Sequence, residues 1–314
     1  MKNEIATREQ QGLTPRGKAE SLINAFLSGK SPKTIEAYGH DIEDFANFCN
    51  RDPNEAVELL LSSSPGEANA QVLAYRAYLL EEGRSPATVN RRLAALKSLT
   101  KLARTIGVIP WTLEVEGVRS KAYRDTRGAG VCGVQAIFSL AKGTSKKAKR
   151  DYAMLRLLYD LGLRRGEVVS LDLADIDLER STLEVVGKGR REKELLTLPE
   201  QTKQALSAWI EARGNAEGAL FLSLDRRGGG GRLTGTSLYR IVRDYGQKAG
   251  IKTRPHGLRH TAITEAVKRA QKAGLPLEVV RDFSRHSDIA TVLIYRDRER
   301  NYQGEIASLV AQTV

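Results

Sequence analysis

The chain of 314 residues carries 50 Lys and Arg against 38 Asp and Glu, a net charge of +12, and 41% of its residues are apolar. This length predicts one large domain or two ordinary ones, and the positive charge favours a polyanionic partner such as nucleic acid, because binding releases condensed counterions. No apolar run is long enough to cross a membrane and residues 1–18 lack the apolar core of a signal peptide, so we expect a cytoplasmic protein with no membrane partner.

The N-terminal third of the chain predicts a polar arm followed by a helical domain. Residues 1–20 show no apolar period and are expected to be flexible, whereas apolar side chains recur at helical spacing from Ser21 onward. Ser31 and Pro32 predict a helix start, because serine caps a helix and proline fits its first turn. Further helices are expected at about 68–82 and after Pro86, with a loop at 62–66, so residues 21–106 form an all-α domain of four or five helices.

Two helix starts in this domain share a short repeat that suits phosphate binding. Residues 29–35 (GKSPKTI) resemble residues 83–89 (GRSPATV), and each places a basic residue, a hydroxyl and an early Thr at a helix N-terminus. Free N–H groups and a partial positive charge there attract phosphate, although ordinary capping explains the repeat equally well. Residues 107–127 hold Pro110 and basic side chains, which predicts a basic linker along a nucleic-acid backbone. The candidate DNA-binding residues of these segments are Lys30, Ser31, Lys33, Thr34, Arg84, Ser85, Thr88, Asn90, Arg91, Arg92, Arg119, Lys121 and Arg124.

Residues 128–314 predict a second domain that combines helices with a small β-hairpin. The turn between its two strands, 187–191, carries Lys188. Glycines 228–231 predict a surface loop rather than a phosphate-binding loop, because no strand–glycine–Lys–Ser/Thr pattern surrounds them. The fold class is therefore mainly α with a small β-hairpin or sheet. Helices are expected at about 134–141, 146–161, 201–213 and 236–249, and strands at about 182–186 and 194–198, where Val, Leu and Thr are frequent.

Short segments of this second domain carry residue types suited to attack on a phosphodiester. Arg164 and Arg259 cannot lose their protons, and each planar guanidinium can bind two phosphate oxygens. His256 and His286 can exchange protons near neutral pH, and Tyr295 offers an oxygen nucleophile able to hold a covalent intermediate. Each residue alone has an ordinary structural explanation, such as a surface ion pair or a core tyrosine, so only their combination is informative.

In combination and in chain order, these segments resemble the active site of the tyrosine recombinases, also called the phage integrase family. The helical domain at 21–106 resembles the core-binding domain of that family, so the likeness covers nearly the whole chain. Gly162-Leu163-Arg164 with Glu167 resembles the family's first arginine box, Lys188 its catalytic lysine, His256-Gly257-Leu258-Arg259-His260 its His-x-x-Arg box, His286-Ser287-Asp288 its third box, and Tyr295 its nucleophile.

The resemblance implies an all-α core-binding domain joined to an α+β catalytic domain at 128–314, together acting as a site-specific recombinase. Such an enzyme cleaves and rejoins duplex DNA at a target site through a 3′-phosphotyrosyl intermediate and a Holliday junction, as a homo-tetramer on DNA and a monomer or dimer when free. No cofactor or ATP is expected, because the phosphotyrosyl ester keeps the energy of the broken bond. The implied roles are phosphate binding for Arg164 and Arg259, nucleophile for Tyr295, acid toward the leaving 5′ oxygen for Lys188, proton exchange with the tyrosine for His256, phosphate hydrogen bonding for His286, and orientation of a basic neighbour for Glu167.

The sequence departs from the family pattern beside His286. Arg285 stands where the family usually has glycine, so we expect a different local geometry, and Arg285 becomes a further candidate for contact with phosphate or DNA. Tyr302 is a second nearby tyrosine, but the flanks of Tyr295 match the nucleophile motif. Residues 267–274 are about one turn longer than usual, which predicts a longer helix. A short apolar stripe near the C-terminus is expected to dock on a neighbouring protomer or on its own domain: Ile306, Leu309 and Val310.

Two other functions remain open at this point. A type IB topoisomerase shares the chemistry, but the helical domain at 21–106 argues against it. A non-catalytic DNA-binding regulator on the same scaffold would not need the complete set of candidate residues.

No metal site is predicted. Asp172, Asp175 and Asp177 are interpreted as caps and turn residues, because ion binding usually needs a tighter loop of oxygens with a Gly turn. Cys49 and Cys132 are far apart without metal-ligand spacing, and they are predicted to be buried thiols in a reducing compartment.

Overall fold

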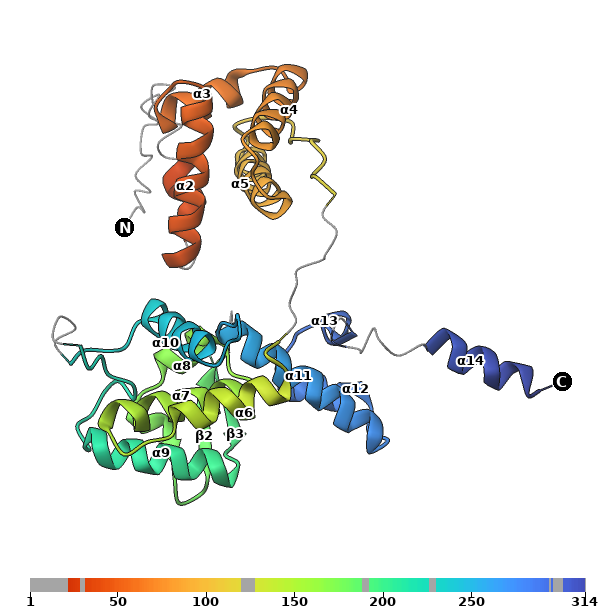
Figure 1. The fold of residues 1–314 in the computed structure, drawn as a ribbon. Coiled ribbons are helices and arrows are strands. Elements are labelled where there is room, and N and C mark those ends of the chain that lie inside the picture. The colour runs from red at the N-terminus through yellow and green to blue at the C-terminus, as the bar shows by residue number, and fades with distance from the viewer. Residues whose placement is uncertain are drawn as a thin grey trace, which may run out of the picture. The chain divides into compact units, whose positions relative to one another are not determined.

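The computed structural model describes residues 22–28, 32–119, 128–187, 192–225, 230–293, 295 and 302–313. The chain divides into two compact units, Met1–Tyr123 and Arg124–Val314. Helices dominate both units, and within the described ranges the one sheet belongs to the second unit (Figure 1). The predicted class, mainly α with a small sheet, is confirmed. The predicted arm at 1–20 lies outside the described residues.

The first unit is a helical domain whose helix starts follow from local capping. Asp52, Ser64 and Ser85 each accept hydrogen bonds from backbone N–H groups of the turn that follows, and each is followed by proline. Aromatic and aliphatic side chains then fill the space between the helices, including the fully buried Phe45 and Tyr75. After a helical segment at 22–27, the elements are α2 Pro32–Phe48, α3 Pro53–Ser62, α4 Pro65–Glu81 and α5 Pro86–Thr105.

The structure corrects two details of this domain. Helix α3 was not predicted, and the loop predicted at 62–66 is shorter, because Pro65 already begins α4. The Ser-Pro pair that suggested a loop is instead the start of a helix: Ser64 and Glu67 form a reciprocal capping box. Part of the predicted linker also belongs to this unit, since Leu113 and Val115 are buried against its core.

The second unit packs its helices around a small antiparallel sheet. Strands β1 Ile176–Asp177, β2 Thr182–Val186 and β3 Lys193–Thr197 pair in that order. Leu183 and Val185 of β2 face a core that also holds the fully buried Trp209. Val186 pairs with Lys193, so the ends of the hairpin are fixed, while Lys188 in its turn lies outside the described residues. The helices are α6 Gly130–Ala141, α7 Lys146–Asp160, α8 Arg165–Ser170, α9 Glu200–Arg213, α10 Gly235–Lys248, α11 Pro255–Lys272, α12 Leu277–Ser284, α13 Ile289–Leu293 and α14 Tyr302–Ala311.

A separate apolar cluster joins α11, α12 and α13. Ile263 and Val267 of α11 pack with Val280 of α12 and Val292 of α13, and Tyr295 belongs to the same cluster. The tyrosine is therefore held by core packing, although it follows a helix of only five residues. The long α11 extends to Lys272, as the extra turn predicted at 267–274 requires.

Several expectations for the second unit need correction. Helix α6 begins at Gly130, four residues earlier than predicted, and β1 adds a third strand that was not predicted. Cys132 is exposed and Cys49 half-buried, so the prediction of buried thiols was wrong, since Cys132 lies in the first turn of α6 on its outer side. Across the described ranges, no helix has the length and apolarity needed to cross a membrane.

Candidate active site

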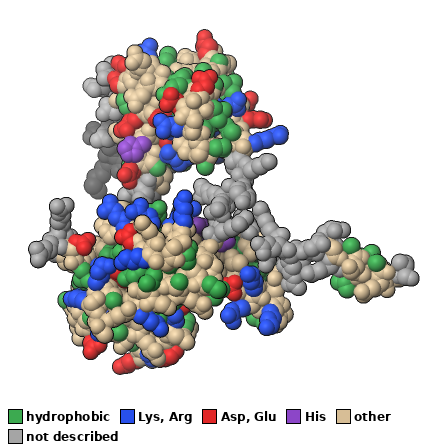
Figure 2. Space-filling model, viewed as in Figure 1, with side chains coloured by type: hydrophobic (Ala, Val, Ile, Leu, Met, Phe, Trp, Pro, Cys, Tyr) green, Lys and Arg blue, Asp and Glu red, His purple; other side chains and the backbone are tan. Residues whose placement is uncertain are grey.

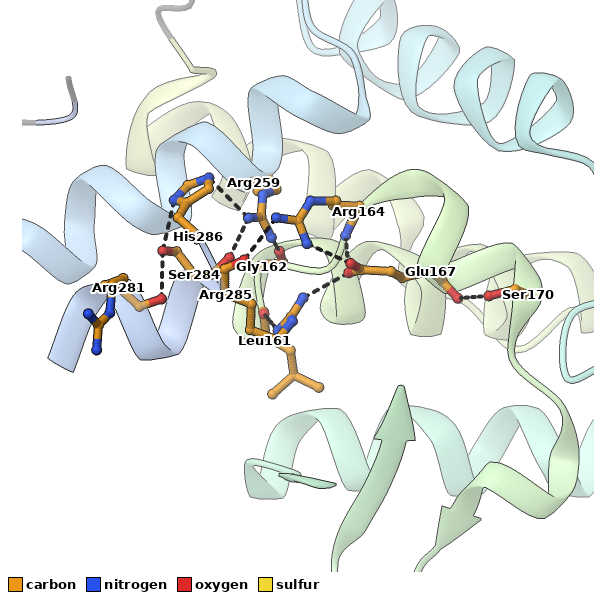
Figure 3. A network of polar contacts seen from close by, with 10 residues as sticks. All are labelled: Leu161, Gly162, Arg164, Glu167, Ser170, Arg259, Arg281, Ser284, Arg285 and His286. Atoms are coloured by element: carbon orange, nitrogen blue, oxygen red, sulfur yellow. Dashed lines mark hydrogen bonds and ion pairs between the residues drawn. The ribbon is translucent and has the colours of Figure 1, made fainter. Parts of the chain in front are cut away.

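The second unit brings together segments that lie far apart in the sequence. Arg164 caps α8 directly after the turn that ends α7, and Arg259 lies in the second turn of α11. Arg285 ends α12, His286 follows it, and Tyr295 follows α13. Figure 3 shows the side chains of the two arginine segments and of His286 pointing toward one another.

Arg259 is fixed by backbone carbonyl groups on both sides. With 2% of its surface exposed, it donates from Nη1 to the Gly162 carbonyl and from Nη2 to the Ser284 carbonyl. Gly162 has φ +55°, a conformation that glycine adopts at little cost. Burial, with the neighbouring charges of Arg164 and Arg285, lowers the pKa of Arg259 to about 10, so it remains protonated at neutral pH.

Arg164 is held by Glu167 one helical turn away. The Arg164 Nη1 donates to Glu167 Oε1 at 2.7 Å, and the Arg164 amide donates to Glu167 Oε2 at 2.8 Å. Burial alone would raise the pKa of Glu167, but the bond from the Arg164 amide and the charges of Arg285 and Arg164 hold this pKa below its usual value. The carboxylate is thus ionised at neutral pH and orients Arg164.

His286 continues the hydrogen-bonded chain on the other side of Arg259. Its Nε2 lies 3.3 Å from Arg259 Nη2, and its Nδ1 lies 2.9 Å from Ser284 Oγ. An arginine can only donate, so Nε2 accepts and the ring proton is on Nδ1. Burial and then the charges of Arg259 and Arg164 lower the pKa of His286 to about 4, in agreement with a neutral ring.

Tyr295 lies against two histidine rings. It is 7% exposed, and its ring centre lies 4.6 Å from that of His260 and 5.8 Å from that of His286. Burial raises the pKa of the phenol, whereas the charges of Arg259 and Arg164 act to lower it. His286 connects the tyrosine to the arginines, because its ring stacks on that of Tyr295 and its Nε2 lies 3.3 Å from Arg259 Nη2.

The described site carries an excess of positive charge. It holds three guanidinium groups, from Arg164, Arg259 and Arg285, whereas Glu167 supplies one negative charge. Because like charges in a partly buried place repel, an anion that bridges Arg164 and Arg259 would be strongly favoured. A phosphate with two free oxygens fits that requirement.

A small cavity extends from these residues toward the β-hairpin. It has a volume of about 170 Å³ and is lined by Arg164, Arg285 and His286 together with Gly187 of the hairpin turn. Gly187 directly precedes Lys188 in the sequence, and Lys188 itself lies outside the described residues.

Comparison with known proteins places this geometry in a family. The model of the phage integrase family matches residues 133–301, and that of a phage integrase N-terminal SAM-like domain matches residues 21–105. The chain belongs to the phage integrase family. A tyrosine recombinase of Synechocystis sp. is 36% identical, with 94% of this chain and 96% of that protein covered, and one of Synechococcus elongatus is 35% identical, with 99% of both covered.

Solved structures of the phage integrase family share the fold. The XerH site-specific recombinase bound to its palindromic difH substrate superposes with a TM-score of 0.69 at 18% identity, covering 94% of this chain and 85% of that one. A lambda integrase dimer bound to a core site gives a TM-score of 0.66 at 16% identity, covering 90% and 96%.

The structure of this integrase-family chain brings most of the predicted site residues together. Arg164, Glu167, Arg259, His286 and Tyr295 lie in one place, and Glu167 orients a basic neighbour as expected. His256 is exposed at the start of α11, and its electrostatic effect contributes to the lowered pKa values of His260 and His286. The side chains of Lys188 and Tyr302 lie outside the described residues. The catalytic roles of all these residues stay predictions.

The sequence analysis did not predict the contacts that two residues of this site make, His260 and Arg285. His260 packs on Tyr295, and burial followed by the electrostatic effect of His256 lowers the pKa of His260 to about 4. Its position four residues after His256 puts it on the same helix face, a signal that was available. Arg285 was a further candidate for contact with phosphate or DNA, and its side chain is 4% exposed and paired with Glu167.

Some candidate DNA-binding side chains form hydrogen bonds or ion pairs within the first unit, and others are exposed. Asn90 bonds both backbone groups of Val118, and Arg92 pairs with Asp44, so these two hold the first unit together. Thr88 bonds the Ser85 hydroxyl, and Arg91 pairs with Asp41 while remaining partly exposed. Arg84, Ser85 and Arg119 are exposed, Thr34 is half-buried, and the side chains of Lys30, Ser31, Lys33, Lys121 and Arg124 lie outside the description.

The second unit has exposed basic side chains that were not among the predicted DNA-binding residues. Figure 2 shows Lys and Arg gathered on the part of this unit that carries α8 and α10. Arg165 on α8 and Arg240 and Arg243 on α10 are exposed there. By contrast, Asp175 and Asp177 accept backbone N–H groups in turns, as predicted, and the described residues contain no cluster of three or more potential metal ligands.

Proposed function

We propose that this integrase-family chain is a site-specific tyrosine recombinase that cleaves and rejoins duplex DNA through a 3′-phosphotyrosyl intermediate. The observation that carries the proposal is the convergence of Arg164, Arg259 and the Tyr295 phenol. Arg164 and Arg259 are fixed by hydrogen bonds and carry excess positive charge. The ring of Tyr295 stacks on that of His286, whose Nε2 lies 3.3 Å from Arg259 Nη2. A phosphodiester bound by the arginines would place its phosphorus within reach of that oxygen.

The cleavage step forms one bond and breaks one. Tyr295 Oη attacks phosphorus, and the bond between phosphorus and the 5′ oxygen of the next nucleotide breaks. His256 takes the proton of the phenol, which burial keeps protonated at neutral pH, and Lys188 gives a proton to the leaving oxygen. Attack by a 5′ hydroxyl of a second strand reverses each transfer and restores the phosphodiester without a nucleotide cofactor.

The arginines would stabilise the negative charge that builds on the nonbridging oxygens during attack. Arg259 is held by two carbonyl groups and His286, and Arg164 by Glu167, so both charges are in place before the reaction begins. Such preorganised charge in a site with little water is the largest single contribution in many enzymes. With its proton on Nδ1, His286 accepts from Arg259, and a direct bond from His286 to the phosphate would require Nε2 to carry the proton.

Assembly on DNA would use surfaces of both units. Helix α14 exposes Ile306, Leu309 and Val310, each more than half exposed, which suits docking on a neighbouring protomer. Residues 21–106 would bind one face of the duplex, with the basic segment at 107–127 continuing along it. Four protomers would then hold two target sites and exchange strands through a Holliday junction.

The test of this function is to trap the covalent intermediate on DNA of unspecified sequence. The full chain would be mixed with a library of nicked duplexes with randomised centres, in which cleavage near the nick releases a short strand and prevents rejoining. We expect adducts that survive denaturant, with one recurrent sequence attached through a 3′ phosphate. Adducts with no sequence preference, with relaxation of any supercoiled plasmid, would indicate a topoisomerase. Sequence-specific binding without an adduct would indicate a regulator.

Lys188 can be tested as the general acid with a modified leaving group. Lys188→Ala should slow cleavage of the recovered duplex, because an alkoxide leaves poorly without a proton. Replacing the 5′ bridging oxygen by sulfur should restore the rate, because a thiolate leaves without one. Lys142→Ala, which removes a charge from the end of α6, serves as control. A Lys188→Ala variant as slow on the sulfur substrate as on the oxygen one would contradict this role.

A further inference from the structure

Arg285 occupies a backbone conformation that normally belongs to glycine. As the C-cap of α12 it has φ +52° and ψ +42°, in the left-handed region where a Cβ atom makes the conformation costly. A bulky side chain persists at such a position when other contacts hold it there. The side chain of Arg285 therefore warrants an explanation beyond helix capping.

Its side chain is directed into the unit rather than toward solvent. Arg285 Nη2 lies 2.8 Å from Glu167 Oε2, and both side chains are about 95% buried, with 4% and 5% of their surfaces exposed. Nη1 donates to the carbonyl of Leu161 at 3.3 Å. A buried arginine is costly unless it is paired, so this ion pair fixes both partners.

The same residue contacts Arg164 through its backbone. The Arg285 carbonyl accepts from Arg164 Nη2 at 3.0 Å, while Arg164 Nη1 donates to Glu167 Oε1 at 2.7 Å. Arg164, Glu167 and Arg285 thus form a closed ring of three contacts (Figure 3). In the left-handed conformation, Arg285 presents its carbonyl to Arg164 and its guanidinium to Glu167.

We infer that Arg285 is a positioning residue, whose buried ion pair with Glu167 fixes the orientation of Arg164 toward the scissile phosphate. This inference rests on the proposed function, because it assigns Arg285 a part in the same phosphate site. Arg285 acts through Glu167 and does not contact the DNA. Its charge also opposes the tendency of burial to raise the pKa of Glu167, so the carboxylate remains ionised and able to accept from Arg164.

The decisive variant is Arg285→Gly, which keeps the left-handed backbone and its carbonyl but removes the guanidinium. The substrate is a fresh duplex that carries the sequence recovered from the covalent adduct. On it we expect single-turnover cleavage to fall about 10- to 100-fold, the size of loss that follows a small displacement of a reacting group. DNA binding should change by about twofold or less, since a positioning defect acts in the transition state. Arg281→Ala is the matched control, because it removes an exposed charge from the same helix.

The pH profile separates this role from a merely structural one. Removing Arg285 takes away one of the charges that lower the pKa of Glu167, so this pKa should rise and the acid limb of the cleavage profile should move to higher pH. Arg285→Lys should restore part of the rate, as a lysine supplies the charge without the second donor. The losses from Arg285→Gly and Glu167→Gln should not multiply in the double variant, because both disrupt one contact ring.

Several outcomes would overturn the inference. These are a cleavage rate of Arg285→Gly equal to that of the wild type or of Arg281→Ala, an unmoved acid limb, or losses that multiply with Glu167→Gln. If Arg285→Gly fails to fold, Arg285→Asn carries the test, because asparagine tolerates the left-handed conformation and also removes the charge. A slower rate with a moved acid limb supports the inference, and a wild-type rate and profile overturns it. A wild-type protein that forms no adduct would instead remove the proposed function itself.

Discussion

Tyr295→Phe is expected to bind the target duplex as the wild type does and to form no covalent adduct. The substitution removes only the phenolic oxygen, which is the atom proposed to bond to phosphorus. The ring stays in its place against His260 and His286 and within the cluster that joins α11, α12 and α13. Loss of one hydroxyl should therefore cost about 1 kcal/mol of stability or less, while cleavage falls below detection.

Three measurements make this result specific. Gel shift with the intact duplex reports binding, thermal unfolding reports the fold, and denaturing electrophoresis of the nicked duplex reports the adduct. Tyr302→Phe is the matched control and should keep the adduct, and proteolysis of the wild-type adduct should give a DNA-linked peptide that contains Tyr295. An adduct that persists in Tyr295→Phe, or a linked peptide from another segment, would move the nucleophile elsewhere.

The candidate site shows which of its features could be predicted from the sequence. The spacing of His256, Arg259 and His260 places all three near the start of one helix, and the strand pattern predicts a hairpin with Lys188 in its turn. Those are local relations, and the structure confirms the helix and both strands. The convergence of distant segments on one site came from the family resemblance, since periodicity alone carries no information about contacts across a hundred residues.

The structural features that the sequence did not predict include a contact between distant residues and one short helix. The sequence made Arg285 a candidate for contact with phosphate or DNA, whereas its contact with Glu167 joins positions 118 residues apart. Its direction follows from a left-handed backbone at the end of α12, which sequence would normally assign to glycine. Helix α3 was not predicted although its start signal is local: Asp52 caps the helix that Pro53 begins, through a capping box with Glu55.

Arg259→Ala is expected to reduce cleavage by roughly 10²–10³-fold, the usual effect of removing one group that stabilises an oxyanion. Arg259 is positioned by the carbonyls of Gly162 and Ser284, so its charge is already in place when the phosphate arrives. Arg259→Lys retains a charge but cannot bridge both carbonyls as the guanidinium does, and its rate should lie between those of the wild type and Arg259→Ala.

The loss must be separated from the damage done by emptying a buried site. Arg150→Ala is the matched control, because Arg150 is 4% exposed and bonds a backbone carbonyl, that of Leu222, away from the site. A similar drop in thermal stability with nearly normal cleavage in Arg150→Ala would show that the rate loss belongs to Arg259. The charge itself is tested with a methylphosphonate at the scissile position, where a methyl group replaces one nonbridging oxygen. If Arg259 stabilises charge on that oxygen, Arg259→Ala should lose far less on the neutral substrate than on the phosphodiester. Equal losses on both would mean that Arg259 only maintains the shape of the site.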